Sequence, residues 1–376
     1  PDLEPILKKT YGVVLFQEQV IEIAVAIAGF TPGEADRLRR VMSRSRPGRE
    51  MEELGELFVE RAEKRGVERE TAETIYSYIR GYASYGFCEA HAAAFGVTAY
   101  RSAYLARHYP AQYFAALLSN WPMGYYPPNT ICTKLRRGGI AILPVDINAS
   151  GARFNVEGGD IRISLSRVSG LGAEVVDGIL KAREDGNFTS LRDFLRRVKI
   201  SERALQNLML CGGLESLEDN RRRLLWRAAG RVGGKRGGTG VGDVPDFTPR
   251  EKVLWERKIL GIEVSGNYME FLRPRLDDAG VLTTASVRER GEGERVAVAG
   301  TVLLPHRPPT RSGATVVFWS LEDETGLVDI LAFPRVYRRY GRLLFPHPGR
   351  PLLVRGEVNR RGGGNVTVVA RHLELL

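Results

Sequence analysis

The stretch TVVFWSLEDETGLVDILAFPRVYRRYGRLL, residues 315–344, contains two strand patterns, a turn and a helix pattern in succession. "TVVFWSL" and "GLVDILAF" are rich in β-branched and aromatic residues, and "EDETG" between them has the composition of a turn. "PRVYRRYGRLL" then has the residues of a helix. A strand hairpin that leads directly into a helix is therefore predicted.

Three more strand patterns surround this stretch. "RVAVAGTVLL" precedes it, and "PLLVRGEV" and "NVTVVARHLEL" follow it, separated by the turn "RRGGGN". Five strands with a helix between the third and the fourth is the order of an OB barrel. Residues 291–376 are therefore predicted to form a five-stranded OB-fold barrel.

Residues 1–120 carry helical patterns. "QEQVIEIAVAIAGF" has a broad apolar face that stops at Gly29, a suitable C-cap. In "TPGEADRLRRVM", Thr31, Pro32 and Glu34 stand at the N-cap, N1 and N3 positions of a capping box. Helical patterns also run through residues 69–87, 91–110 and 111–120. This segment is predicted to be helical.

The middle of the chain changes character three times. Residues 121–168 predict a connector with a helix, a Gly-Gly turn and short strands, one of them in "DIRISLSRV". Residues 169–229 contain short helices between glycine turns, arranged as two hairpin-like units in tandem. Residues 230–290 open with the Gly-rich linker 230–245 and continue with a helix capped by Thr248.

Composition limits the class of protein. The 376 residues include 55 Lys and Arg against 45 Asp and Glu, which gives a net charge of +10 and favours a polyanionic partner. The three cysteines, Cys88, Cys132 and Cys211, form no CxxC pair, so a disulfide framework is not expected. The expected location is therefore a reducing cytoplasm. No apolar run is long enough to span a bilayer.

The stretch YGFCEAHAAAF, residues 85–95, places Cys88 and His91 three residues apart. A thiol nucleophile with its base is one interpretation, but no other part of such a signature is visible. A zinc site needs three or four ligands, and the five histidines form no such cluster. The remaining interpretation is a loop between helices in which Ala92–Ala94 are small because another element packs against them.

Three groups of residues point to nucleic acid. "SGLGAEVV" exposes backbone N–H groups at Gly170 and Gly172, where a helix N-terminus can bind phosphate, and Arg167, Lys181 and Arg183 lie near it in the sequence. In the predicted barrel, Phe318 or Trp319 could stack a base, and Arg335, Arg338 and Arg339 could contact phosphates. Arg39 and Arg40 form a guanidinium pair near the end of a capped helix.

Four long motifs converge on one family. They are "YGVVLFQEQVIEIAVAIAGFTPGEADRLRRVM", "YGFCEAHAAAF", "YRSAYLARHYPAQYFAALL" and "LPVDIN". Together they resemble the bacterial C-family DNA polymerases, which comprise the alpha subunits of DNA polymerase III and their error-prone relatives. "FCEAHAAAF" followed by "NWPMGYYPP" is similar to the error-prone branch, where replicative members usually have Asn-Lys-Ser at residues 88–90.

The resemblance implies a multidomain α+β architecture. Residues 1–120 would be a helical fingers segment, 121–168 a connector with short strands, 169–229 a tandem helix-hairpin-helix module, 230–290 a linker and helix, and 291–376 the OB-fold barrel. Arg39 and Arg40 would face the incoming deoxynucleoside triphosphate, with His91 in a matching turn. The partners would be primer-template duplex and single-stranded template.

The resemblance also implies what this segment does not contain. The family's Mg²⁺ ions are held by an Asp-x-Asp strand of the palm domain, and nothing here matches it, so no catalytic or metal-binding residue is expected and the segment is expected to be inactive alone. The sliding-clamp motif would fall where the Gly-rich linker lies, so recruitment by accessory mutagenesis proteins is expected instead. The alternative hypothesis is a stand-alone, non-catalytic DNA-binding protein built from the same modules.

Overall fold

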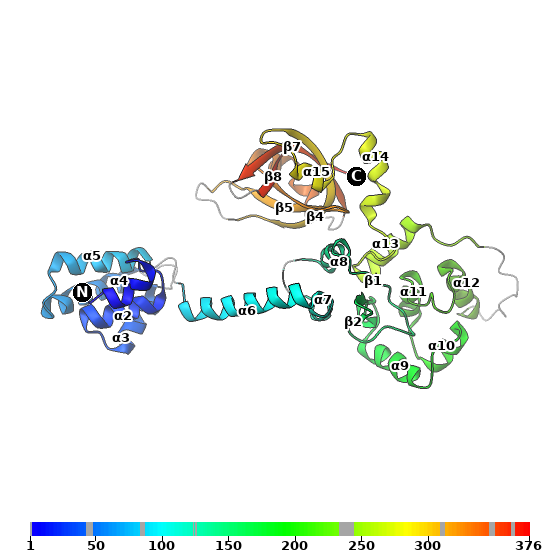
Figure 1. The fold of residues 1–376 in the computed structure, drawn as a ribbon, viewed down its shortest axis with the longest axis horizontal. Helices are drawn as coiled ribbons and strands as arrows, with labels where there is room; N and C mark the ends of the chain where they lie inside the picture. Colours follow the sequence, from blue (N-terminus) through cyan, green and yellow to red (C-terminus); the bar gives the residue numbers. More distant parts are fainter. Residues whose placement is uncertain are drawn as a thin grey trace. The chain divides into compact units, whose positions relative to one another are not determined.

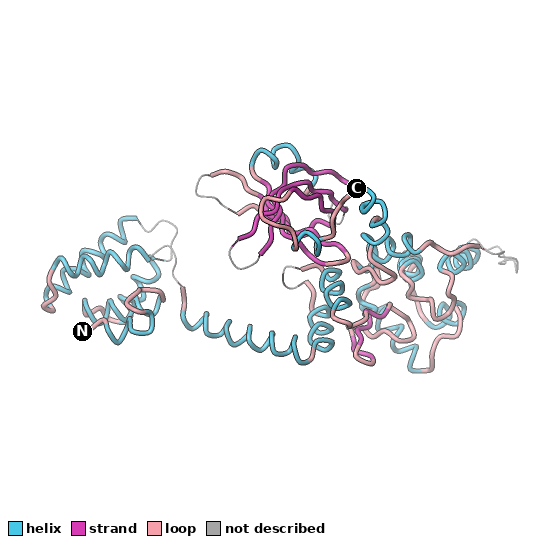
Figure 2. Tube along the Cα trace, turned by 45° about the horizontal axis from the view of Figure 1, so that its top comes forward, coloured by secondary structure: helices cyan, strands magenta, loops and turns pink. Residues whose placement is uncertain are grey.

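A computed structural model describes residues 2–42, 48–82, 87–122, 124, 126–232, 244–308, 313–345, 350–361 and 365–376. The chain divides into two compact units, residues 1–108 and 109–376 (Figures 1 and 2). Tyr85 and Gly86 of the motif at 85–95, and most of the Gly-rich linker, lie outside the described residues.

The first unit is helical, as the sequence predicts. Its elements are α1 (Glu4–Leu7), η1 (Lys8–Thr10), α2 (Gln17–Ala28), α3 (Pro32–Met42), α4 (Gly48–Lys64), α5 (Arg69–Tyr82) and α6 (Glu89–His108). Its core forms from the apolar faces of α2 to α5 and includes Ile23, Leu38 and Phe58.

The predicted caps of α2 and α3 are confirmed. Gly29 ends α2 in the left-handed region at φ 64°, where glycine carries no Cβ penalty. At the start of α3, the Glu34 backbone N–H donates to Thr31 Oγ1, and the Thr31 backbone N–H donates in return to Glu34 Oε2 at 2.8 Å.

The second unit begins with a helical part around a small sheet. It contains α7 (Pro110–Ser119), α8 (Pro128–Arg137), β1 (Ile142–Leu143), β2 (Asn155–Glu157), β3 (Asp160–Arg162), η2 (Leu165–Arg167), α9 (Ala173–Glu184), α10 (Leu191–Arg197), α11 (Glu202–Leu210), α12 (Arg221–Val232) and α13 (Pro249–Leu260). The strand order is β1-β3-β2, with β1 parallel to β3.

The strand predicted in "DIRISLSRV" is shorter than its pattern. Regular pairing stops at Arg162, and residues 165–167 form the 3-10 helix η2. The apolar residues Ile163, Leu165 and Val168 are all buried in the helical core of this unit. The pattern therefore reports burial beyond the strand as well as within it.

The last part of the chain is the predicted barrel. Its strands are β4 (Arg295–His306), β5 (Val317–Asp323), β6 (Gly326–Ala332), β7 (Pro351–Arg361) and β8 (Asn365–Leu375), with α16 (Pro334–Tyr340) and η4 (Gly341–Leu343) between β6 and β7. They close in the order β4-β5-β6-β8-β7, because β8 pairs parallel with β6 and antiparallel with β7. Figure 2 shows the closed ring of strands.

Short helices join the two parts of this unit. They are η3 (Tyr268–Phe271), α14 (Arg273–Asp278) and α15 (Thr284–Arg288). Met269, Leu276 and Val281 pack on Ala299 of β4 and Leu353 of β7, so they cover one end of the outer face of these strands. No helix in the described part of the chain is long and apolar enough to cross a membrane.

Candidate nucleic-acid interface

Arg39 and Arg40 share one carboxylate on α3. Arg39 Nε donates to Asp36 Oδ1 at 2.9 Å, and Arg40 Nε donates to Asp36 Oδ2 at 2.7 Å. Arg39 Nη1 also donates to Gln17 Oε1 at the start of α2. The two guanidinium groups are therefore held side by side at the protein surface, with Arg40 the more exposed.

The first turn of α6 is capped by a residue of α2. Glu18 Oε2 accepts from the Glu89 N–H at 3.0 Å, and Glu18 Oε1 accepts from the Cys88 thiol at 3.1 Å and the Ala90 N–H at 3.4 Å. Partial burial alone would raise the pKa of Glu18, but these hydrogen bonds lower it to about 2. An ionised carboxylate at a helix N-terminus satisfies free N–H groups and the helix dipole.

The prediction of a loop over residues 85–95 is wrong from Glu89 onward, because these residues form the first turns of α6. Ala93 and Ala94 are exposed, so the small side chains do not mark a tight contact among the described residues. His91 is exposed too and packs on Phe95 of the next turn, with ring centroids 4.4 Å apart. The Cys88 thiol donates to Glu18 Oε1, and among the described residues it forms no hydrogen bond with His91.

The thiol and zinc interpretations find no support. Cys132 and Cys211 are buried, and burial raises the pKa of each thiol to about 12, so both remain protonated. Within the described ranges, no three His, Cys, Asp or Glu side chains are grouped as metal ligands. The three consecutive acids of the barrel, Glu322 to Glu324, are not grouped as metal ligands either. Asp323 and Glu324 both pair with Arg273, and Glu322 accepts from Thr130.

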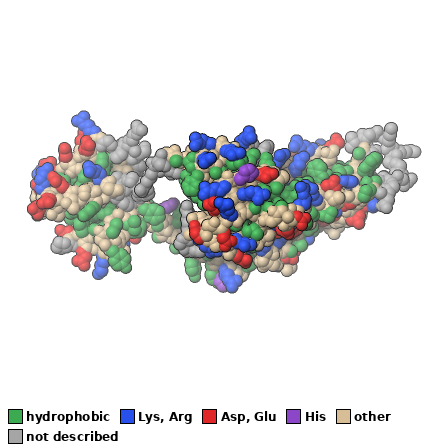
Figure 3. Space-filling model, turned by 90° about the horizontal axis from the view of Figure 1, so that it is seen from above, with side chains coloured by type: hydrophobic (Ala, Val, Ile, Leu, Met, Phe, Trp, Pro, Cys, Tyr) green, Lys and Arg blue, Asp and Glu red, His purple; other side chains and the backbone are tan. Residues whose placement is uncertain are grey.

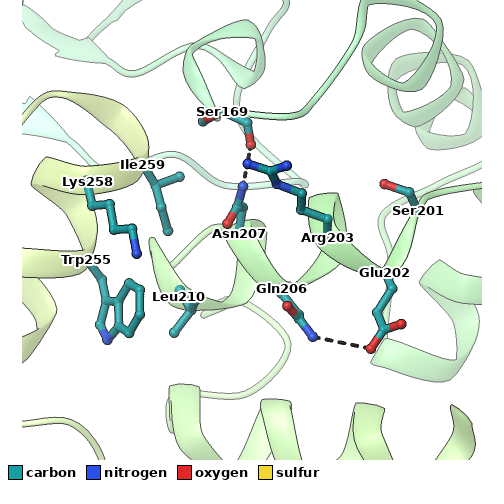
Figure 4. Close-up of a pocket in the computed structure, with 10 residues that line it drawn as sticks. All are labelled: Ser169, Ser201, Glu202, Arg203, Gln206, Asn207, Leu210, Trp255, Lys258 and Ile259. Atoms are coloured by element: carbon teal, nitrogen blue, oxygen red, sulfur yellow. Dashed lines mark hydrogen bonds between the residues drawn. The ribbon is translucent and has the colours of Figure 1, made fainter.

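The glycine turn before α9 has the geometry of an anion site. Gly170 adopts φ +86°, a conformation that favours glycine, and Asn207 Nδ2 donates to the Ser169 carbonyl at 2.6 Å to hold the turn (Figure 4). Gly172 is the N-cap of α9, and no atom lies within 4 Å of the position of an added Cβ. The N–H groups of this helix start are therefore reachable from outside.

A pocket of about 890 Å³ opens beside this turn. Arg203 and Gln206 of α11 and Trp255 and Lys258 of α13 line it together with Ser169 (Figure 4). Lys258 Nζ lies 5.0 Å from the centre of the Trp255 ring. The sequence pattern did not indicate Trp255 or Lys258, because α13 is about 90 residues from the turn, and it did not indicate Arg203 of α11 either. The described lining of the pocket includes two cations, Arg203 and Lys258, and one acid, Glu202. The two cations suit the phosphates of a nucleic-acid backbone.

The three basic residues predicted near the turn have different roles. Arg167 donates to the Leu260 carbonyl and stacks on Trp121, and Arg183 donates to the carbonyls of Ile147 and Ser150. These contacts give the guanidinium groups of Arg167 and Arg183 a structural role, because they hold segments of the protein together, and a phosphate contact by either residue stays a prediction. Lys181 is exposed, without a hydrogen bond or ion pair to any described residue, and stays a predicted phosphate contact.

The two aromatic residues of β5 point in opposite directions. Trp319 is 2% exposed and forms the centre of the barrel core, so the prediction that it could stack a base is wrong. Phe318 lies on the outer side and stacks on His306 of β4, with centroids 5.6 Å and planes 21° apart. Strand alternation places only one of two neighbours outside. Phe318 therefore stays a predicted stacking residue.

The arginines of α16 lie on the surface. Arg335 and Arg338 are exposed and form no hydrogen bond or ion pair with the described residues, and Arg339 lies over the ring of Tyr340. In Figure 3, Lys and Arg side chains gather over the part of the surface where the barrel lies. This distribution suits a polyanion.

Three family descriptions match successive parts of the chain. Residues 1–66 match "Bacterial DNA polymerase III alpha subunit finger domain", residues 139–224 match "Helix-hairpin-helix motif", and residues 296–376 match "OB-fold nucleic acid binding domain". The helix-hairpin-helix match contains the glycine turn, and the OB-fold match contains all five strands of the barrel.

The alignments with curated relatives extend over nearly the whole of this chain. The chain is 48% identical to the "Error-prone DNA polymerase" of Symbiobacterium thermophilum, an alignment that covers 100% of this chain and 40% of the relative. It is 36% identical to the "Error-prone DNA polymerase" of Anaeromyxobacter dehalogenans strain 2CP-C, over 96% of this chain and 33% of the relative. The chain thus spans between a third and two fifths of the length of these relatives.

Among solved structures, asparaginyl-tRNA synthetase from Pyrococcus horikoshii is similar over 26% of this chain and 23% of its own, with 21% identity and a TM-score of 0.22. A finger domain, a helix-hairpin-helix motif and an OB-fold domain follow one another in a chain that aligns throughout with error-prone polymerases. The chain is thus similar over its whole length to error-prone DNA polymerases, and its residues 1–66 match the finger domain of the bacterial DNA polymerase III alpha subunit.

Proposed function

We propose that this chain is the nucleotide-facing and DNA-holding part of an error-prone DNA polymerase. The observation that carries the proposal is the 48% identity to such a polymerase over the whole chain. The complete enzyme would transfer deoxynucleotides to a primer as a template directs, in translesion synthesis and DNA repair. In that enzyme the helix-hairpin-helix module would hold the duplex and the barrel would hold single-stranded template.

The arrangement of Arg39 and Arg40 supports a role at the incoming triphosphate. Both guanidinium groups contact the same carboxylate, Asp36, and phosphate oxygens can replace it because guanidinium donors match both anions. Asp36 would hold the two side chains in position until the nucleotide arrives. His91, exposed in the first turns of α6, would belong to the same site.

Mg²⁺ would act in the complete enzyme at carboxylates that the described residues of this chain do not provide, since its acidic pairs in the barrel are occupied by arginine and threonine. The 376-residue chain alone would then bind DNA without extending a primer. Recruitment would depend on accessory mutagenesis proteins instead of direct clamp binding, and the enzyme would work in the cytoplasm.

The test uses steady-state kinetics of the complete polymerase. The double variant R39A/R40A should raise the KM for nucleotides or lower kcat, with little change in DNA affinity. R37A is the matched control, because Arg37 is on the same helix but pairs with Glu50 of α4. Equal kinetics of R39A/R40A and R37A would reject the assignment. Primer extension by the 376-residue chain alone would reject its proposed inactivity.

A further inference from the structure

A groove of about 580 Å³ lies on the outer face of β4, β7 and β8, away from the β5 strand that carries Phe318. Ala297 of β4 forms its floor, because this small side chain stands opposite Arg355 of β7 in the strand register. Gly280, in the turn between α14 and α15, forms part of the rim. The groove borders the apolar cluster of Met269, Leu276 and Val281, because Ala297 both lines the groove and packs against that cluster.

Three arginines line the groove. Arg295 comes from β4, Arg355 from β7 and Arg371 from the irregular position of β8 where the register with β7 shifts. Arg371 pairs with Glu357 at 2.9 Å, and this hydrogen bond holds the pKa of that carboxyl below its ordinary value. The lowered pKa keeps Glu357 ionised. It is the single acid among the described lining residues, so with three arginines the groove keeps a net positive charge.

Two of the arginines have no bonded partner among the described residues. Arg295 stands across from Glu357 in the register but forms no ion pair with it within 4 Å, and Arg355 forms no hydrogen bond or ion pair. Both side chains are exposed. Their positions are fixed by neighbouring strands of a closed barrel, so they offer two guanidinium groups to a ligand from a rigid surface.

The lining selects the chemistry of that ligand. None of the described residues that line the groove is aromatic, so these residues provide no ring for a base to stack on. Planar guanidinium groups suit the oxygens of phosphodiesters. We propose that Arg295, Arg355 and Arg371 form a second phosphate-binding site of the barrel, which holds the backbone of a single DNA strand. The inference rests on the proposed DNA-holding role and adds to it a site where phosphates, without bases, are recognised.

The test measures binding of a fluorescent oligothymidylate to the 376-residue chain by anisotropy at several salt concentrations. R295A/R355A should weaken binding about tenfold or more at low salt and reduce the slope of log K against log salt by about 1.4, since each single-strand phosphate contact contributes about 0.7. K8A/R80A removes two exposed charges from the first unit and controls for net charge; it should leave the slope unchanged.

A second substrate separates this site from stacking at Phe318. On an abasic oligonucleotide, R295A/R355A should retain its full effect, whereas F318A should lose its effect because no base is left to stack. W319A is unsuitable as a probe because Trp319 fills the core. Thermal unfolding should show that R295A/R355A folds normally, since neither side chain has a bonded partner.

The outcomes distinguish the two proposals. If wild type binds no single strand at low salt, the proposed DNA-holding role of the barrel fails. If F318A weakens binding but R295A/R355A matches K8A/R80A in affinity and slope, only the groove proposal is overturned, and the groove is then free to accept an acidic protein surface. The groove proposal would also be overturned if R295A/R355A weakened binding to the thymidine-containing strand but not to the abasic strand. A phosphate site must act on both strands.

Discussion

Single residues connect segments that are far apart in the sequence, and Glu18 is the strongest example. Its carboxylate caps α6 from α2, about 70 residues away. Replacing Glu18 by Gln removes the charge and should loosen the first turn of α6. Loss of a cap costs about 1 kcal/mol, so amide exchange at Glu89 and Ala90 should become about fivefold faster at pH 7. Hydrogen exchange with mass spectrometry on peptides from 87 to 95 measures this.

The pH dependence follows from the sign of the pKa shift of Glu18. Its pKa falls from 4.5 to about 2 in the folded protein, so its stabilising contribution is complete above pH 4.5 and disappears as pH falls through 2. The difference between wild type and E18Q should therefore shrink over that range. E22Q, an exposed change on the same helix, is the control. Exchange in E22Q as fast as in E18Q would contradict the capping role.

Lys181 and Arg183 are two residues apart and are expected to respond oppositely. R183A loses bonds to two carbonyls, at Ile147 and Ser150, and should cost about 1.5–3 kcal/mol of stability without a change in the salt dependence of DNA binding. K181A should leave the melting temperature unchanged and reduce the salt slope for duplex by about 0.9. Calorimetry and anisotropy titrations measure the two effects; a destabilised K181A would reverse this assignment.

The same pair shows what the sequence can predict at this scale. Charge and position near a glycine turn made Arg167, Lys181 and Arg183 equal candidates. The carbonyl partners of Arg167 and Arg183 lie 93 and 33 residues away, so only the folded chain reveals them. Phe318 and Trp319 were different, because strand alternation already required that one be buried, although not which one.

At the scale of elements, helix starts and strand patterns were predictable because their signals are local. Thr31 with Glu34 and Thr248 with Glu251 form the expected capping boxes, and the five barrel strands fall on their β-branched runs. The start of α6 was not predictable from local signals, since its cap, Glu18, comes from another helix. The pocket beside Ser169 was missed for the same reason: α13 brings Trp255 and Lys258 to a turn distant in sequence.

The glycine turn permits a clean test of the helix-hairpin-helix element. Gly170 has φ +86°, so a substitution there strains the turn, whereas Gly172 has φ −73° and open space. G172D should keep or raise the melting temperature, because Asp is a favoured N-cap. Its carboxylate would stand where a phosphate is expected, so duplex affinity should fall about tenfold or more. Anisotropy with two unrelated duplexes measures this.

G158D is the charge-matched control for that element. Gly158 lies in the exposed turn between β2 and β3 at φ +60°, a conformation that Asp tolerates. It changes net charge equally and should weaken duplex binding much less than G172D. Similar losses in both variants would mean that net charge, and not the turn, governs binding.

On the scale of the whole second unit, the helical part and the barrel meet at a buried carboxylate. Glu322 of β5 is 6% exposed and accepts from Thr130 Oγ1 of α8 at 2.8 Å. Burial raises its pKa from 4.5 to about 7; the hydrogen bond from Thr130 and the nearby Arg257 oppose the rise, and Glu263 and Asp323 add to it. Both parts are thus joined through a group that titrates near neutrality.

The sign of this shift predicts that stability falls as pH rises. Between pH 4.5 and 7 the folded chain binds the Glu322 proton more tightly than the unfolded chain, so folding weakens through that range and the loss levels off above 7. At 1.36 kcal/mol per pKa unit, the loss is on the order of 3 kcal/mol. E322Q keeps an oxygen acceptor for Thr130 but carries no charge, so it should be more stable than wild type at pH 8 and similar to it at pH 5.

Thermal unfolding of wild type and E322Q at pH 5, 6, 7 and 8 measures the difference in their stability. Taking the difference cancels the titration of all other groups, because the two chains share them. E374Q changes an exposed carboxylate of β8 in the same barrel and should show no pH-dependent difference from wild type. Parallel curves for wild type and E322Q would mean that Glu322 stays ionised and is compensated by Arg257. A difference that grows from pH 5 to 7 and then stays constant would place a protonated carboxyl at the contact between the helical part and the barrel.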